Sequence, residues 1–157
     1  MRKRDFIPFL VLWLGLVGCA HGPEPVDSAS LSEEGRGVAE NAATFYQLLM
    51  QKDIASRHTR PDLEPFFESP SDTSLYIADL LWQMREKRLQ NRRILDYRVT
   101  EVEFFSEGKE AETIVALRGR YYVFTWRTFW RKDRWIRTGD RWFLKPYPQI
   151  GRSIVEP

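Results

Sequence analysis

Residues 128–146 read TFWRKDRWIRTGDRWFLKP, and this stretch decides the fold class. Gly139-Asp140 suits a two-residue hairpin turn, because glycine tolerates the positive φ required at the first central position. The pairs expected across this turn are Thr138 with Arg141, Arg137 with Trp142, Ile136 with Phe143 and Trp135 with Leu144. The alternation would put tryptophan and leucine side chains on one face and arginine and lysine side chains on the other. The stretch therefore predicts an antiparallel β-hairpin with one buried face.

The two-residue period extends upstream of this hairpin. Residues 97–105 alternate imperfectly between apolar and polar side chains, residues 106–109 are typical of a turn, and residues 112–124 form a further strand. Pro146 and Pro148 end the sheet, because proline cannot donate to a strand ladder. We expect an antiparallel meander.

The spacing of apolar residues before residue 93 is helical instead. Ser32 suits the cap of a helix that runs to about residue 52, with apolar positions at Val38, Ala42, Phe45, Leu48 and Leu49. Prolines allow only a short helical turn around residues 62–67. A second helix is expected from residue 71 or 72 to about residue 91, with apolar positions at Leu75, Ala78, Leu81, Trp82 and Leu89. Helices followed by an antiparallel sheet indicate a single α+β domain over residues 34–148, with a tail at 149–157.

The start of the chain has the pattern of a secretory signal. Three basic residues precede residues 6–17, an apolar run. As a helix this run would span about 18 Å, too short for a hydrocarbon core of about 30 Å. It is followed by Leu16-Val17-Gly18-Cys19, which holds the sole cysteine. This motif resembles the lipobox of bacterial lipoproteins. A plain signal peptide or short anchor with an incidental cysteine is the alternative.

The lipobox resemblance implies a membrane anchor. A diacylglycerol would be attached to the Cys19 sulfur, residues 1–18 would be removed, and the new amine would be acylated. Residues 19–33 would be a lipidated, flexible tether. Ala20 in place of aspartate implies the outer membrane by the sorting rule of such lipoproteins, with the domain facing the periplasm. The membrane would then be one partner of the chain.

Charge is distributed unevenly along the chain. The formal net charge is +2, and removal of residues 1–18 would leave 21 charges of each sign. Residues 19–81 hold four basic and eleven acidic side chains, whereas residues 118–157 hold ten basic and three acidic ones. This polarity would either steer a partner or place acidic helices across a basic sheet.

The order of the elements resembles the nuclear-transport-factor-2-like fold. A long first helix ending in QKD, a broken middle with a further helix, and strands closing on WIRTGDRWFL carry the resemblance, over roughly residues 34–148. It implies a curved antiparallel sheet wrapped round the helices as a cone. Some members, such as ketosteroid isomerase and polyketide cyclases, place an Asp or His base and a Tyr donor inside the cone. Others are catalytically silent. No local motif here matches the enzymes, so no catalytic residue is carried over.

Four residues are candidates for acid–base chemistry. His58, with Asp62 four residues further on, would form an acid–base pair, although the polar run around His58 is also typical of a solvated loop. Tyr46 and Tyr97 would donate hydrogen bonds if they lined a cavity, or else pack in the core. No residues have metal-ligand spacing, and no cofactor motif is present, so neither a metal nor a cofactor is expected.

Arginine and tryptophan interleave along residues 126–142. The expected binding surface consists of Arg127, Arg131, Arg134, Arg137, Trp130 and Trp135. Such a surface would hold an anionic envelope polymer, lipid headgroups or an acidic protein, or would be a sheet with tryptophan inside and arginine outside. An exported lipoprotein is not expected to bind nucleic acid. The sequence therefore predicts a lipid-anchored envelope protein that binds an envelope component without catalysis. The alternatives are a small-ligand-binding or isomerase-like enzyme that uses the cone cavity, and a homodimeric structural subunit.

Overall fold

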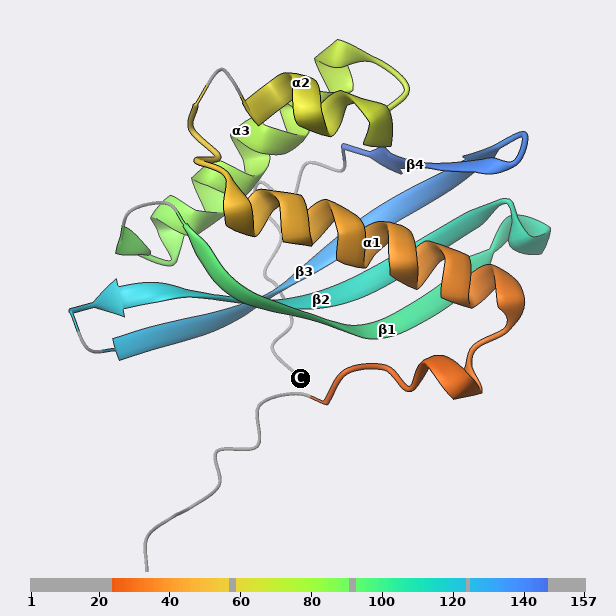
Figure 1. Cartoon of the computed structure of the whole chain (residues 1–157), viewed down its shortest axis with the longest axis horizontal. Helices are drawn as coiled ribbons and strands as arrows, with labels where there is room; N and C mark the ends of the chain where they lie inside the picture. Colours follow the sequence, from red (N-terminus) through yellow and green to blue (C-terminus); the bar gives the residue numbers. More distant parts are fainter. Residues whose placement is uncertain (1–23, 57–58, 91–92, 124, 147–157) are drawn as a thin grey trace, which may run out of the picture.

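The computed structural model describes residues 24–56, 59–90, 93–123 and 125–146, and Figure 1 shows their arrangement. The helical elements are η1 (Ser28–Ser30), α1 (Glu33–Gln51), α2 (Arg60–Leu63), η3 (Glu64–Phe66), α3 (Pro70–Glu86) and η5 (Ser106–Gly108). The strands are β1 (Ile94–Phe105), β2 (Glu110–Tyr122), β3 (Thr125–Thr138) and β4 (Arg141–Lys145). They form one antiparallel sheet in the order β1-β2-β3-β4. The predicted α+β class and the antiparallel meander are confirmed.

The terminal hairpin has the predicted register. All four expected pairs, from Thr138 with Arg141 to Trp135 with Leu144, occur between β3 and β4. Gly139 has a φ of +63°, so the turn uses the backbone freedom for which glycine was expected there. Trp135 and Leu144 are fully buried. One face of this hairpin therefore enters the core, as its alternation predicted.

Helix α1 also follows the prediction. The Ser32 hydroxyl accepts a hydrogen bond from the Gly35 N–H at 3.1 Å, which satisfies a free donor of the first turn. Val38, Ala42, Phe45 and Leu49 are completely buried along one side of the helix. The helix lies alongside β1 (Figure 1).

Helix α3 buries a different face from the predicted one. Leu75 and Trp82, expected in the core, are 60% and 38% exposed. The buried residues are Thr73, Tyr76, Ile77, Asp79, Leu80, Gln83 and Met84. The prediction of the apolar face was wrong because three polar residues of α3 point inward. Tyr76 and Asp79 contact Arg131 of β3, and Gln83 donates to Asp79.

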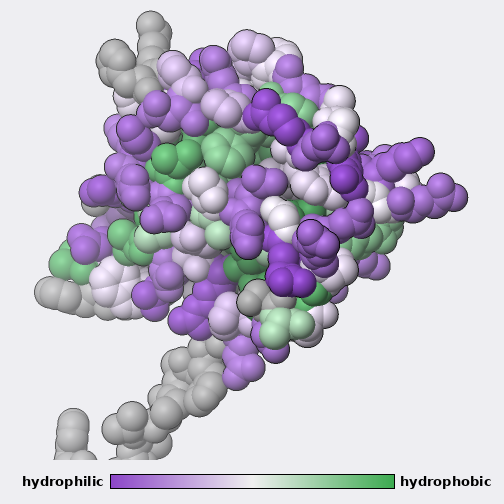
Figure 2. All heavy atoms as spheres, turned by 45° about the vertical axis from the view of Figure 1, so that its right-hand side comes forward, coloured by the Kyte–Doolittle hydropathy of each residue, from purple (hydrophilic) through white to green (hydrophobic). Residues whose placement is uncertain are grey.

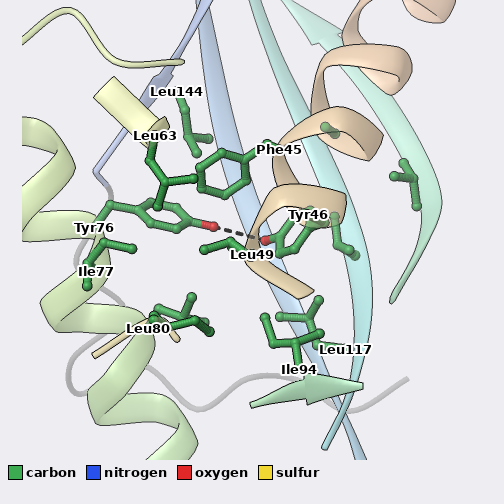
Figure 3. Packing of buried hydrophobic residues seen from close by; sticks show 14 of the residues in the cluster. Phe45, Tyr46, Leu49, Leu63, Tyr76, Ile77, Leu80, Ile94, Leu117 and Leu144 are labelled. Atoms are coloured by element: carbon green, nitrogen blue, oxygen red, sulfur yellow. Dashed lines mark hydrogen bonds between the residues drawn. The ribbon is translucent and has the colours of Figure 1, made fainter. Parts of the chain in front are cut away.

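The core is packed with aromatic rings around Phe45. Its ring makes edge-to-face contacts with those of Tyr46, Phe66 and Tyr76, at centroid distances of 5.3–5.4 Å. Figure 3 shows Phe45, Tyr46 and Leu49 of α1 directed toward Tyr76, Ile77 and Leu80 of α3. The space between the two helices is thus filled by side chains.

The segment before α1 is docked on the sheet. The Val26 N–H donates a hydrogen bond of 2.8 Å to the Val99 carbonyl of β1, and the Val26 side chain packs against the core. Asp27 caps η1 by accepting from the Ala29 N–H at 2.9 Å. The described part of the predicted tether is therefore packed on the domain and is not a separate, flexible segment.

The described helices are all too short or too polar to cross a membrane. Figure 2 shows that hydrophilic residues cover most of the visible face, with hydrophobic residues in small separate patches. Cys19, the lipobox and the tail at 149–157 lie outside the described residues.

Candidate functional site

A buried polar cluster lies between α1, α3 and β3. It consists of Tyr46, Tyr76, Asp79, Gln83, Arg131 and Asp133, and each residue is at most 5% exposed. Charged residues are rarely buried to this degree unless they are paired. The cluster is thus the largest departure of this core from an apolar interior.

Arg131 is the centre of the cluster. Its Nη1 donates to Asp79 Oδ2 at 2.7 Å, and its Nε donates to Asp133 Oδ1 at 2.9 Å and to the Tyr76 hydroxyl at 3.0 Å. The guanidinium carbon also lies 4.2 Å from the centroid of the Tyr76 ring, in a cation–π contact. One buried cation therefore joins two carboxylates that come from α3 and β3.

The two tyrosine hydroxyls complete the cluster. Their oxygens lie 2.9 Å apart, and a dashed line joins them in Figure 3. The Tyr46 hydroxyl donates to Asp133 Oδ2. The Tyr76 hydroxyl lies 3.0 Å from Asp133 Oδ1. Each hydroxyl has one proton, so Tyr76 donates either to Asp133 or to Tyr46 while it accepts from Arg131. Asp133 thus receives hydrogen bonds at both carboxylate oxygens.

Burial keeps both phenols protonated. It raises the pKa of Tyr46 well above its ordinary value, and the negative charge of Asp133 raises it further. The pKa of Tyr76 is also raised, mainly by burial, although Arg131 opposes the effect. Burial alone would lower the pKa of Arg131, but the electrostatic interactions with Tyr76 and Asp133 raise it above its ordinary value. The cluster therefore contains two neutral tyrosine hydroxyls beside a permanent cation that is paired with Asp79 and Asp133.

One atom of the cluster has no partner. Gln83 Nε2 donates to Asp79 Oδ2 at 3.2 Å, while Gln83 Oε1 is the one buried side-chain polar atom without a hydrogen bond among the described residues.

The contact between the tyrosine hydroxyls and Asp133 has the chemistry for proton transfer. Since all six side chains are packed inside the core, a substrate would have to displace packed groups to reach them.

Among the described residues, the predicted acid–base candidates have different partners. Tyr46 and Tyr97 stack, with ring centroids 5.7 Å apart and planes at 26°. Asp62 lies on α2, where its carboxylate pairs with Lys52 at 2.9 Å and is 45% exposed. His58 lies outside the described residues. For Tyr46, core packing is confirmed over the lining of an open cavity.

The predicted arginine and tryptophan surface is divided by the alternation of β3. Arg131 and Trp135 are buried, so their assignment to a binding surface was wrong. Arg127 and Arg137 turn to the helices, where Arg127 Nη1 donates to the Lys87 carbonyl at 3.2 Å and Arg137 Nη1 pairs with Glu34 at 2.8 Å. The residues left for the opposite face are Trp130 and Arg134, because successive strand residues point to opposite sides.

Acidic residues of the helices pair with basic residues of the sheet, which is one of the two interpretations of the uneven charge distribution given above. Arg137 pairs with Glu34 of α1, Arg131 with Asp79 of α3, and Lys145 of β4 with Glu68 before α3. The Glu68 carboxyl accepts from Lys145 and from Thr138, which lowers its pKa. The charge polarity of the sequence is therefore used, at least in part, within the domain.

The other face of the sheet carries its own ion pairs. Lys132 Nζ lies 2.9 Å from Glu112 Oε1, and Arg134 pairs with Glu110, both across β2 and β3. Trp130 shares this face and is half-buried. Helices α1 and α3 lie on the opposite side of the sheet (Figure 1). This open face consists of Glu110, Glu112, Trp130, Lys132 and Arg134.

A pocket of about 320 Å³ lies between the segment before α1, α1 itself and β1. Its apolar lining includes Val26, Ala39 and Val99, and its polar groups come from Arg36, Glu40 and Arg98. Tyr97 also lines the pocket, and its ring stacks on that of Tyr46. This edge pocket has the size and mixed lining of small-ligand sites.

Within the described ranges, no group of three His, Cys, Asp or Glu residues is placed to hold a metal ion. Comparisons of the chain with protein-family models, with curated proteins and with solved structures found no match.

Proposed function

We propose that this chain is a bacterial lipoprotein, held in the outer membrane by lipid on Cys19 and facing the periplasm. Its α+β domain, of the nuclear-transport-factor-2-like type, binds a protein or another envelope component without catalysis. The lipobox at residues 16–19 supports the anchor. Helices that precede and pack on an antiparallel meander support the fold type.

The observation that carries the proposal is the filled interior. The side of the sheet that faces the helices is occupied by Phe45, Tyr76, Phe129 and Trp135, all buried, and by the ion pairs of Arg131. An enzyme that used the inside of a cone would need room there for its substrate. The filled interior favours binding of a partner at the surface of the domain. There, the open face presents Trp130 between charged residues.

The edge pocket supports a second function, the binding of a small ligand. Its volume of about 320 Å³ is near the lower end for such sites. Arg36 and Glu40 on α1 would orient a polar ligand over an apolar floor. This function would not need the buried cluster.

Replacing Cys19 with alanine is expected to move most of the protein from the membrane fraction to the soluble fraction. The variant lacks the thiol to which the lipid would be attached, and several acyl chains are needed for stable anchoring. Fractionation of cells with antibody detection measures this, and incorporation of labelled palmitate should disappear in the same variant. A Cys19→Ala protein that stays membrane-bound would contradict the anchor.

Reversing two charges on the open face is expected to reduce partner capture at least about tenfold. The partner expected for this surface is anionic, so the new glutamates would repel it across the interface. The variant is Lys132→Glu with Arg134→Glu, and capture is measured as cross-linked product from a photo-reactive residue at position 130. The matched control is Lys52→Glu on the helical side, whose side chain is 42% exposed.

Urea unfolding of both variants separates binding from stability. The open-face variant should lose capture while it remains folded, and the control should keep capture. A product of twice the chain mass would identify a second copy of this chain as the partner. Equal cross-linking in the variant and the control would contradict the use of the open face.

A further inference from the structure

The end of the β2–β3 hairpin exposes large apolar side chains. Tyr122, Val123 and Trp126 are 56%, 64% and 52% exposed. Tyr121 packs against Tyr122 with ring centroids 4.3 Å apart, and Trp126 lies on the neighbouring strand, where its backbone pairs with Arg120. We call Tyr121, Tyr122, Val123 and Trp126 the hairpin tip. Single exposed apolar residues are common on protein surfaces, but a group of this kind at the end of a hairpin suggests a partner.

Arginines surround the hairpin tip. The guanidinium carbon of Arg127 lies 4.0 Å from the Tyr121 ring centroid, and that of Arg120 lies 5.7 Å from the Trp126 ring. The pKa of Tyr121 is lowered by its hydrogen bond with Tyr122, and the charges of Arg127 and Arg88 lower it further. The tip is therefore an apolar group with a basic collar made of Arg88, Arg120 and Arg127.

This combination matches the interface of a bilayer. Tyrosine and tryptophan concentrate at the level of the lipid headgroups, and arginine extends to anionic phosphates while its stem stays in apolar surroundings. Sugar polymers also stack on aromatic rings. Val123, the most exposed member of the tip, has a purely aliphatic side chain and gains more from hydrocarbon than from a sugar surface.

The docked N-terminal segment brings the tip within reach of the same membrane. Val26 is fixed to Val99, and Val99 pairs with Val115 of β2. Tyr122 is seven residues further along β2, which is about 23 Å. Between Cys19 and Val26 the chain advances seven residues, and a fully extended chain of that length reaches about 25 Å. One bilayer can therefore hold the lipid on Cys19 and also touch the tip.

From this geometry we infer that the hairpin tip inserts into the headgroup region of the bilayer that holds Cys19, with the basic collar against anionic headgroups. The inference rests on the lipid anchor of the proposed function. It gives the domain a fixed orientation, with the tip on the membrane and the β3–β4 turn, at the other end of β3, away from it.

A single labelled cysteine tests this. Lipidation uses the only native thiol, so Val123→Cys in the full lipidated protein takes one environment-sensitive fluorophore. The protein is reconstituted in vesicles of phosphatidylethanolamine and phosphatidylglycerol that contain a lipid with a shallow nitroxide quencher. The matched control is Asp140→Cys in the β3–β4 turn. We expect quenching at position 123 to exceed that at position 140 at least about twofold.

Two further comparisons test the role of charge. In vesicles of phosphatidylcholine alone, the quenching at position 123 should fall, because the basic collar then lacks anionic headgroups. Arg120→Glu should lower it in the anionic vesicles as well. Quenching that is the same with and without phosphatidylglycerol would overturn the role of the collar.

The outcomes separate the tip from the anchor. A protein that floats with the vesicles but is quenched equally at positions 123 and 140 overturns the insertion of the tip alone. A protein that does not float overturns the anchor, and this inference with it. Protection of the probe at position 123 by isolated peptidoglycan, without quenching in vesicles, would assign the tip to a sugar polymer instead.

Discussion

Replacing Arg131 with methionine is expected to lower the free energy of unfolding by about 3–5 kcal/mol, because it leaves buried carboxylates without their cation. Asp79 and Asp133 both contact the guanidinium, and Arg131 is 1% exposed. Methionine replaces the unbranched stem of arginine but provides neither charge nor donors. Urea unfolding followed by tryptophan fluorescence measures the change.

Arg134→Met is the matched control for this variant. Arg134 lies on the same strand, points to the opposite face, and is 46% exposed in its ion pair with Glu110. Its removal should change the free energy of unfolding by no more than about 1 kcal/mol. If Arg131→Met does not fold at all, Arg131→Lys keeps the charge and should fold with reduced stability. Equal losses for Arg131→Met and Arg134→Met would contradict the special role of the buried cluster.

Stability is expected to fall steeply above about pH 10, the pKa of an unperturbed tyrosine. The pKa values of Tyr46 and Tyr76 in the folded protein lie above that value. Below pH 10 both residues are protonated in the folded and unfolded chains, so they add no pH dependence. Above it the unfolded chain releases protons that the folded chain retains. The free energy of unfolding then falls by about 1.4 kcal/mol per pH unit for each tyrosine.

Urea unfolding between pH 8 and pH 11 measures this slope, and phenylalanine variants assign it. Tyr46→Phe should make the slope clearly shallower, because burial raises the pKa of Tyr46 well above its ordinary value. Tyr122→Phe should change the slope less, because the pKa of this exposed residue is raised mainly by its hydrogen bond with Tyr121 and not by burial. Both variants retain the lysines that titrate in the same range, so the difference between them isolates Tyr46. A Tyr46→Phe slope equal to that of the unaltered protein would show that the phenol is not held protonated by the fold.

The sequence predicted those parts of the fold that depend on local periodicity. Alternation around Gly139 determined the register of the last hairpin, and the spacing of Val38, Ala42, Phe45 and Leu49 determined the buried side of α1. In both cases the residues that enter the core are apolar. Hydrophobic spacing is then a sufficient guide.

The buried side of α3 was missed because its decisive residues are polar. Asp79 is paired in the core with Arg131, a residue 52 positions away, and Gln83 in turn donates to Asp79. A clue was present on β3. Phe129, Arg131, Asp133 and Trp135 share one face by the period of two, so a strand that buries Phe129 and Trp135 must also bury the two charges between them.

The open face and the edge pocket depend on the arrangement of elements that are distant in sequence. Residues that lie next to each other on β3, such as Lys132 and Arg131, have opposite environments, so a run of basic residues could not identify a surface. The edge pocket forms only because Val26 pairs with Val99. The spacing of apolar and polar residues along the chain does not predict that pairing.

The ion pairs of Arg131 also bear on how strand β3 is aligned during folding. A slip of one residue against β2 would turn Trp130, Lys132 and Arg134 toward the helices and would expose Phe129 and Trp135. Asp79 of α3 would then be buried without the guanidinium that meets it at 2.7 Å in the native alignment. An apolar core tolerates several packings of similar energy, but a charged cluster with fixed partners penalises all of them except one. The cluster therefore disfavours misaligned β3 strands more strongly than apolar residues at the same positions would.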